Sequence, residues 1–143
     1  MERLLKLNKK FEPLKRDDGD EFFANGIFEF NITKLLAHIE SKPEIYTVEQ
    51  VCVRSIIDYK AKSLDEETVR DANLSNPILL AEISPGRFNV IDGNHRMERA
   101  RRDQVEKILA KRVLADQHMP FLTSMKAYET YVEFWNSKIK EQS

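Results

Sequence analysis

The chain has 143 residues, of which 41% are hydrophobic, and this composition predicts one globular domain rather than a disordered chain. The 23 basic side chains nearly balance the 24 acidic ones, and a net charge of -1 argues against a protein that holds nucleic acid by bulk charge. The single cysteine, Cys52, can form neither an internal disulfide nor a cysteine-based zinc site. Because no apolar run is long enough to cross a bilayer and no secretory signal opens the chain, we expect a cytoplasmic protein with no membrane contact and no metal site of its own.

The chain divides into three predicted parts. Residues 1–24 are charged and poorly periodic, so we expect an arm that becomes ordered only by packing against the rest. Residues 25–122 are predicted to form the main domain. Residues 123–143 carry apolar side chains at helical spacing, which predicts an amphipathic C-terminal helix packed on that domain.

The first half of the main domain contains three short patterns. Apolar and polar side chains alternate over residues 28–32, which is typical of a half-buried strand. Residues 35–39 follow in a helical pattern. Residues 64–69 predict another short helix, because acidic side chains fill its first turn.

Two predictions compete for residues 48–59. Apolar residues at helical spacing and a capping box formed by Thr47 and Gln50 favour a helix that buries Cys52 as a structural thiol. The β-branched content of residues 48–53 (VEQVCV) favours a strand there instead.

The second half alternates strands and helices. Residues 78–83 form a nearly continuous apolar run, as in a buried strand, and residues 87–91 alternate after a Ser-Pro-Gly turn. A helix is predicted from about residue 94 to 104, and a further strand over residues 108–114. The fold class that follows is α/β (α+β), with a small mixed β-sheet flanked by helices.

The residues with the clearest chemical potential lie where the 87–91 strand passes into the helix. They are Asp92, Gly93, Asn94, His95 and Arg96. Gly93 permits a positive φ, and Asn94 is suited to cap the helix. The free N–H groups of a helix start attract anions, and we expect Arg96 to lie exposed there, where its guanidinium can bind a phosphate. His95 adds a hydrogen-bonding group, and Asp92 is able to hold a metal ion or accept a proton.

The same residues also suit an ordinary turn between a strand and a helix. Taken alone, the pattern fits this structural interpretation at least as well as a binding site. The presence of His95, Arg96 and Arg99 together shifts the balance modestly toward a site.

The segment IDGNHRMERA resembles the signature turn of the ParB/sulfiredoxin superfamily. Residues 93–100 are similar in form to the G-E-R-R-x-R-A motif of ParB-type partition proteins. Residues 93–96 are similar to the G-C-H-R of sulfiredoxins, and residues 92–96 to the D-G-H-T-R of free serine kinases. The likeness extends from about Leu64 to Leu114, since Asn76-Pro77-Ile78 and the strand KILAKRVL also resemble their counterparts in these families.

The resemblance implies a ParB/sulfiredoxin-like fold that binds a nucleoside triphosphate or diphosphate, with Mg²⁺, and hydrolyses it or transfers its phosphate to a small molecule. The residues it implies for the phosphates are Gly93, Asn94, His95, Arg96, Arg99, Asn76 and Pro77, with Asp92 as the catalytic carboxylate. Asn94 stands where sulfiredoxins have their catalytic cysteine, so we expect no reduction of sulfinic acids. After Leu114 we expect one helix rather than the helix-turn-helix domain of partition proteins.

Two alternatives to a nucleotide-dependent enzyme stay open. One is a DNA-associated ParB-like module that acts with a partner protein in partition, regulation or nucleolytic processing. The other is an interaction protein that kept the fold and lost the chemistry.

Several further residues have a structural and a functional interpretation. A basic patch, comprising Arg96, Arg99, Arg101, Arg102, Lys107, Lys111 and Arg112, is able to meet nucleic-acid phosphates. For Arg101, Arg102 and Lys107 we favour a solvated helix face balanced by acidic neighbours. The possible second carboxylates are Glu29, Glu49 and Glu98. His38 and His118 are predicted to lie on the surface or in loops, and Tyr131 to be partly exposed.

Overall fold

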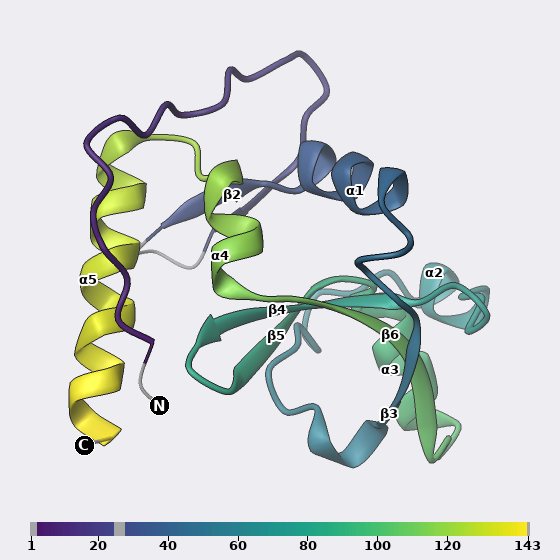
Figure 1. Cartoon of the computed structure of the whole chain (residues 1–143). Helices are drawn as coiled ribbons and strands as arrows, with labels where there is room; N and C mark the ends of the chain where they lie inside the picture. The colour runs from purple at the N-terminus through teal and green to yellow at the C-terminus, as the bar shows by residue number, and fades with distance from the viewer. Residues whose placement is uncertain (1–2, 25–27, 143) are drawn as a thin grey trace.

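The protein, described by a computed structural model over residues 3–24 and 28–142, is built around a four-stranded sheet (Figure 1). Its strands lie in the order β3 (Glu49–Cys52), β6 (Lys107–Val113), β4 (Ile78–Ser84) and β5 (Arg87–Asp92). Strands β4 and β6 are parallel, whereas β3 pairs with β6 and β5 pairs with β4 in antiparallel fashion. The predicted small mixed sheet flanked by helices is therefore confirmed as an α+β architecture.

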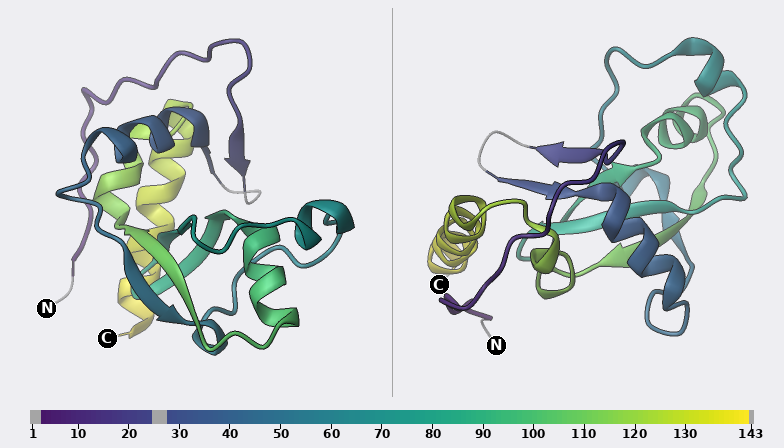
Figure 2. Two further views of the ribbon diagram at one scale, coloured as in Figure 1. Left: turned by 90° about the vertical axis from the view of Figure 1, so that its right-hand side faces the viewer. Right: turned by 90° about the horizontal axis from the view of Figure 1, so that it is seen from above.

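Helices cover both faces of this sheet (Figure 2). Helix α3 (Asn94–Arg102) packs on one face, which we call the α3 face, and the short α2 (Glu66–Arg70) lies beside α3. Helices α1 (Ile32–Ser41), α4 (Ala115–His118) and α5 (Met125–Gln142) cover the other face, which we call the α1 face. Strand β4 is central and covered on both faces, which explains why its sequence is a continuous apolar run.

The two faces of the sheet carry separate hydrophobic cores. On the α3 face, Met97 and Ala100 of α3 pack against Ile78 and Leu80 of the sheet. On the α1 face a larger core gathers around Trp135, which is fully buried. Alternate residues of β4, β5 and β6 thus point to different helices.

The N-terminal arm lies along α5, as Figure 1 shows. The indole N–H of Trp135 donates to the carbonyl oxygen of Arg3 at 2.6 Å, and Asn136 bonds both the N–H and the carbonyl oxygen of Leu5. The ring of Phe11 stacks on Tyr128 with centroids 4.2 Å apart. The arm is therefore packed against α5 through these contacts. Its last residues also form β1 (Phe22–Ala24), which pairs with β2 (Glu29–Asn31) and which the sequence analysis missed.

The helix prediction for residues 48–59 is wrong, and the strand alternative for residues 48–53 is right over residues 49–52. Residues Glu49–Cys52 form β3, followed by the 3₁₀ turn η1 (Val53–Ser55). Pairing with β6 makes this segment a strand, because it hydrogen-bonds the backbone N–H and C=O groups and points successive side chains to opposite faces of the sheet. Val51 therefore faces the core while Cys52 is exposed, so the predicted burial of its thiol is also wrong.

The remaining elements follow the sequence more closely. The predicted strand over residues 28–32 is shorter than expected, since its backbone passes into α1 at Ile32, where the Asn31 side chain accepts from the Lys34 N–H and caps the helix. η2 (Met119–Phe121) leads into the predicted C-terminal helix. On that helix, Tyr131 is fully buried rather than partly exposed. Within residues 3–24 and 28–142, no helix combines the length and the hydropathy that crossing a bilayer requires.

Candidate functional site

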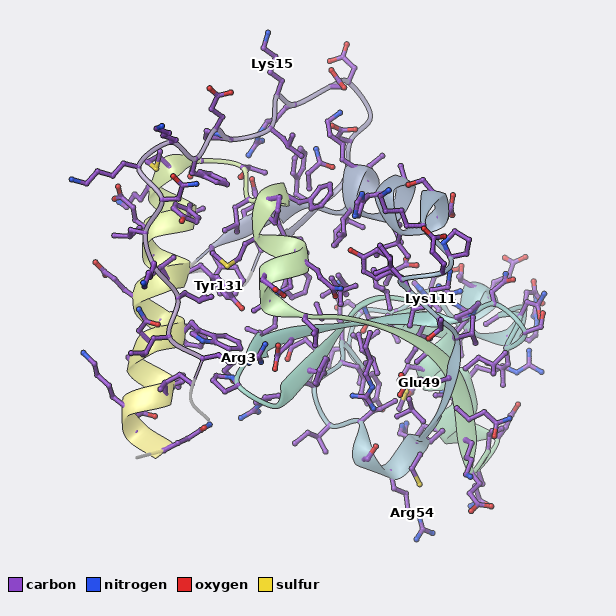
Figure 3. The ribbon with its side chains drawn as sticks, in the orientation of Figure 1. Arg3, Lys15, Glu49, Arg54, Lys111 and Tyr131 are labelled. Carbon is purple, nitrogen blue, oxygen red and sulfur yellow. The ribbon has the colours of Figure 1, made fainter. Side chains whose placement is uncertain are left out.

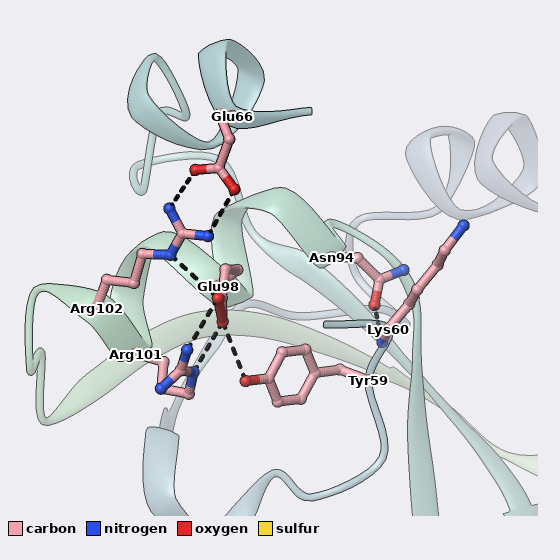
Figure 4. A network of polar contacts seen from close by, with 7 residues as sticks. All are labelled: Tyr59, Lys60, Glu66, Asn94, Glu98, Arg101 and Arg102. Atoms are coloured by element: carbon pink, nitrogen blue, oxygen red, sulfur yellow. Dashed lines mark hydrogen bonds and ion pairs between the residues drawn. The ribbon is translucent and has the colours of Figure 1, made fainter. Parts of the chain in front are cut away.

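The turn from β5 into α3 has the geometry that the sequence predicts. The helix begins at Asn94, directly after Gly93, whose φ of 98° and ψ of 25° lie in the left-handed region. A Cβ at this position would lie 2.7 Å from Cγ2 of Ile78, so the close approach of strand and turn also requires glycine. Gly93 itself is the N-cap residue. Asn94 is the first helical residue, so its predicted capping role is wrong, and its side-chain oxygen instead accepts from the Lys60 N–H at 2.7 Å (Figure 4).

Arg96 joins the ends of two strands. One terminal nitrogen donates to the carbonyl oxygen of Pro77 at 3.0 Å, and the other bonds the carboxylate of Asp92 at 3.1 Å. Its side chain is 19% exposed, so the expectation of an exposed arginine is wrong. These bonds bring Pro77, Asp92 and Arg96 together, and Asn76 lines the same hollows.

His95 and Arg99 hold the segment around α2 against α3. Nε2 of His95 accepts from the Asp65 N–H at 3.3 Å. Arg99 forms an ion pair with Asp103 at 3.0 Å and donates to the carbonyl oxygens of Arg70 and Ala72. Both side chains therefore have a structural role.

Two surface hollows meet at this turn. The α2-side hollow has a volume of about 600 Å³, and the α1-side hollow has a volume of about 350 Å³. Asn76, Asp92 and Arg96 line both. The α1-side hollow is also lined by Leu36, Ile39 and Glu40, which the sequence analysis did not place in a site, and by Lys111, which it placed only in the basic patch. The period of β6 was the available signal for Lys111, because it sets this side chain on the opposite face from its neighbours Ala110 and Arg112.

The buried carboxylate of Glu98 lies on α3 and is fully engaged (Figure 4). Arg101 binds it at 2.8 and 2.9 Å, Arg102 at 3.1 Å, and the Tyr59 hydroxyl donates to it at 3.3 Å. The hydrogen bond from Arg101 is the main cause that lowers the pKa of Glu98 from 4.5 to about 2, with Arg102 adding to it. The predicted balance of Arg101 and Arg102 by acidic neighbours is thus confirmed, and Glu66 also bonds Arg102 at 2.6 and 3.0 Å.

The other candidate carboxylates also have partners outside the turn. Glu29 pairs with Arg16 and accepts from Thr123, and Glu49 pairs with Arg112 at 2.8 Å. Neither lines the two hollows, so Asp92 is the carboxylate that both share.

A second group of buried polar side chains lies under α5. His118 is fully buried, and its Nε2 lies 2.7 Å from the carbonyl oxygen of Glu82, to which the Tyr131 hydroxyl also donates at 3.1 Å. Burial lowers the pKa of His118 from 6.5 to about 4. The predicted surface or loop position of His118 is wrong, because α4 turns this residue inward against the ring of Phe30, 5.1 Å away.

Across the described residues, no group of three or more His, Cys, Asp or Glu side chains is placed to hold a metal ion. No protein-family model matches the chain, and no curated protein matches it significantly.

Proposed function

We propose that the protein binds a phosphorylated small molecule, in the first instance a nucleotide, at the turn from Asp92 to Arg96. The arrangement of Arg96 at the start of α3 carries this proposal. The first N–H groups of a helix have no partner within the helix, and they attract anions. Here they lie beside a guanidinium that is held in place by Asp92 and the Pro77 carbonyl oxygen.

The resemblance to ParB/sulfiredoxin proteins supports the same choice. It implies nucleotide phosphates at this turn, and the strand, Gly93 and helix follow one another as that motif requires. We expect a Mg²⁺ ion to arrive with the phosphates, as Mg²⁺ is commonly bound through substrate phosphates and one or two carboxylates.

The DNA-associated alternative has less support in the geometry. The arginines of the basic patch are mostly neutralised, since Arg99, Arg101, Arg102 and Arg112 all pair with carboxylates. Their charge is thus less available to nucleic-acid phosphates.

Titration with ATP, CTP and GTP, with and without Mg²⁺, tests the proposal by calorimetry and by melting temperature. A nucleotide at about 100 times its Kd stabilises the fold by about 2.7 kcal/mol. We expect Arg96→Gln to weaken binding about 10- to 100-fold, because it loses a charge-assisted bond of about 1.5–3 kcal/mol. The melting temperature of the ligand-free variant reports separately on the bonds to Pro77 and Asp92.

Arg54→Gln is the matched control. Arg54 is exposed in η1, and Figure 3 shows it pointing away from the molecule, remote from the turn. The control should bind like the wild type. Absence of any nucleotide effect on the wild type, or unchanged affinity in Arg96→Gln, would refute the proposed function.

If the bound nucleotide is also hydrolysed, we expect the Asp92 carboxylate to act as the general base, because it is the acidic side chain paired with Arg96. Phosphate release from each nucleotide then falls in Asp92→Asn.

A further inference from the structure

The two hollows at the turn differ in charge. In addition to the shared residues, the α2-side hollow contains the acidic side chains of Asp65, Glu67 and Asp71. The α1-side hollow contains one further acidic residue, Glu40, and one further basic residue, Lys111. Since like charges repel, a phosphate is disfavoured on the α2 side relative to the α1 side.

Lys111 lies on the α1 face of β6, opposite Leu79 of β4. Figure 3 shows it at the level of the sheet beneath α1. The residue is half-buried, and among the described residues its ammonium group has no hydrogen bond or ion pair. This contrasts with the arginines of α3, each of which has a carboxylate partner.

A half-buried ammonium without a counter-charge loses hydration and gains no compensating bond in the empty protein. An anion in the α1-side hollow would supply that bond. Arg96 also lines this hollow, and its bonds to Pro77 and Asp92 leave part of its donor capacity free.

We infer that Lys111 is a phosphate-binding residue and that the ligand's phosphate groups lie in the α1-side hollow, between Lys111 and Arg96. The inference rests on the proposed function and specifies which side of the turn the ligand occupies. The side chains of Leu36 and Ile39 and the ring of Pro77 provide an apolar wall for the remainder of the ligand. The ligand class is a phosphate ester or pyrophosphate with a compact organic part.

Calorimetric titration with inorganic pyrophosphate tests this placement directly. Lys111→Met keeps the aliphatic stem and removes only the charge, and we expect it to weaken pyrophosphate binding about 10-fold or more. Lys111→Arg should restore most of the affinity. Lys107→Met, at an exposed lysine on the same strand, is the matched control and should bind like the wild type.

Glu67→Gln distinguishes the two sides of the turn. It removes one acidic charge from the α2-side hollow and leaves the α1-side hollow unchanged. If the phosphate lies beside Lys111, the variant should bind pyrophosphate with nearly wild-type affinity. A marked gain in affinity would instead place the phosphate on the α2 side and overturn the inference.

The failures of the two proposals are distinguishable. Loss of pyrophosphate binding in Arg96→Gln but not in Lys111→Met overturns the role of Lys111 and leaves the proposed function standing. A wild type that binds nucleotides but not pyrophosphate also overturns the placement. A wild type that binds neither refutes both.

Discussion

Glu98 on α3 and Glu82 on β4 are both buried, and the fold satisfies their carboxylates by different means. On the α3 face, Glu98 is 3% exposed and receives Arg101 and Arg102 from the next turn of its own helix. Glu82 on β4 is equally buried but receives Arg3 from the far N-terminal arm and the N–H groups of Gly86 and Ala115.

The difference shows how each region is assembled. The carboxylate on α3 is balanced by residues three and four positions away, so its environment forms with the helix. The carboxylate on β4 is balanced only once the arm, the sheet and α4 have come together. The α3 region is thus organised locally, and the α5 region depends on long-range packing.

Trp135→Ala should lower stability the most, because Trp135 lies in the core of the α5 region, which depends on long-range packing. The indole is fully buried and also bonds the Arg3 carbonyl oxygen. Its removal should lower the free energy of unfolding by about 3–5 kcal/mol. Urea denaturation measures this loss, and limited proteolysis should show that the arm is released as well.

Glu133→Ala, at an exposed position of the same helix, is the control and should stay within about 0.5 kcal/mol of the wild type. If the arm stays protected from protease in Trp135→Ala, the long-range description of this region is wrong.

Gly93→Ala tests the local region at the turn. A left-handed backbone costs a residue with a Cβ about 1–2 kcal/mol. Crowding against Ile78 and the Arg96 guanidinium should add about 1–3 kcal/mol.

Gly86→Ala separates the two costs, because Gly86 has a φ of 75° but no heavy atom within 4 Å of an added Cβ. Thermal unfolding of both variants should therefore show the greater loss for Gly93→Ala. Equal losses would mean that the turn relaxes away from Ile78.

The two regions should lose stability over different pH ranges as the pH falls, because His118 belongs to the α5 region and Glu98 to the α3 region. A pKa lower in the folded than in the unfolded state gives stability that is complete above the unfolded pKa and lost as the pH falls toward the folded one. For His118 this loss runs from pH 6.5 to about 4, because the buried ring stays neutral while the unfolded chain takes up a proton. For Glu98 it runs from pH 4.5 to about 2.

Urea unfolding from about pH 7 to about pH 2 covers both pH ranges and measures the loss of stability in each. His118→Gln should flatten the upper window, and Glu98→Gln should flatten part of the lower one. Glu98→Gln should also lose about 1.5–3 kcal/mol near neutral pH, since Arg101 and Arg102 lose a charged acceptor. An upper window that persists in His118→Gln would show that another group titrates there.

The sequence by itself determined the elements whose signal is local. The alternation of residues 87–91, the glycine at 93 and the helical pattern after it predict a strand, a turn and a helix start that the structure reproduces. The spacing of apolar residues likewise predicts α5. In each case the periodicity of one segment fixes which side is buried.

Tertiary structure decided the features that depend on a partner distant in the chain. Pairing with β6 made residues 49–52 a strand and left Cys52 exposed. The packing of α4 buries His118, and the hydrogen bond from Arg96 to the Pro77 carbonyl oxygen holds the guanidinium partly buried. Lys111 faces α1 because β6 lies between β3 and β4 in the sheet. Periodicity within a segment indicates that a side chain is buried or exposed, but the atoms it meets are set by which segments the fold brings together.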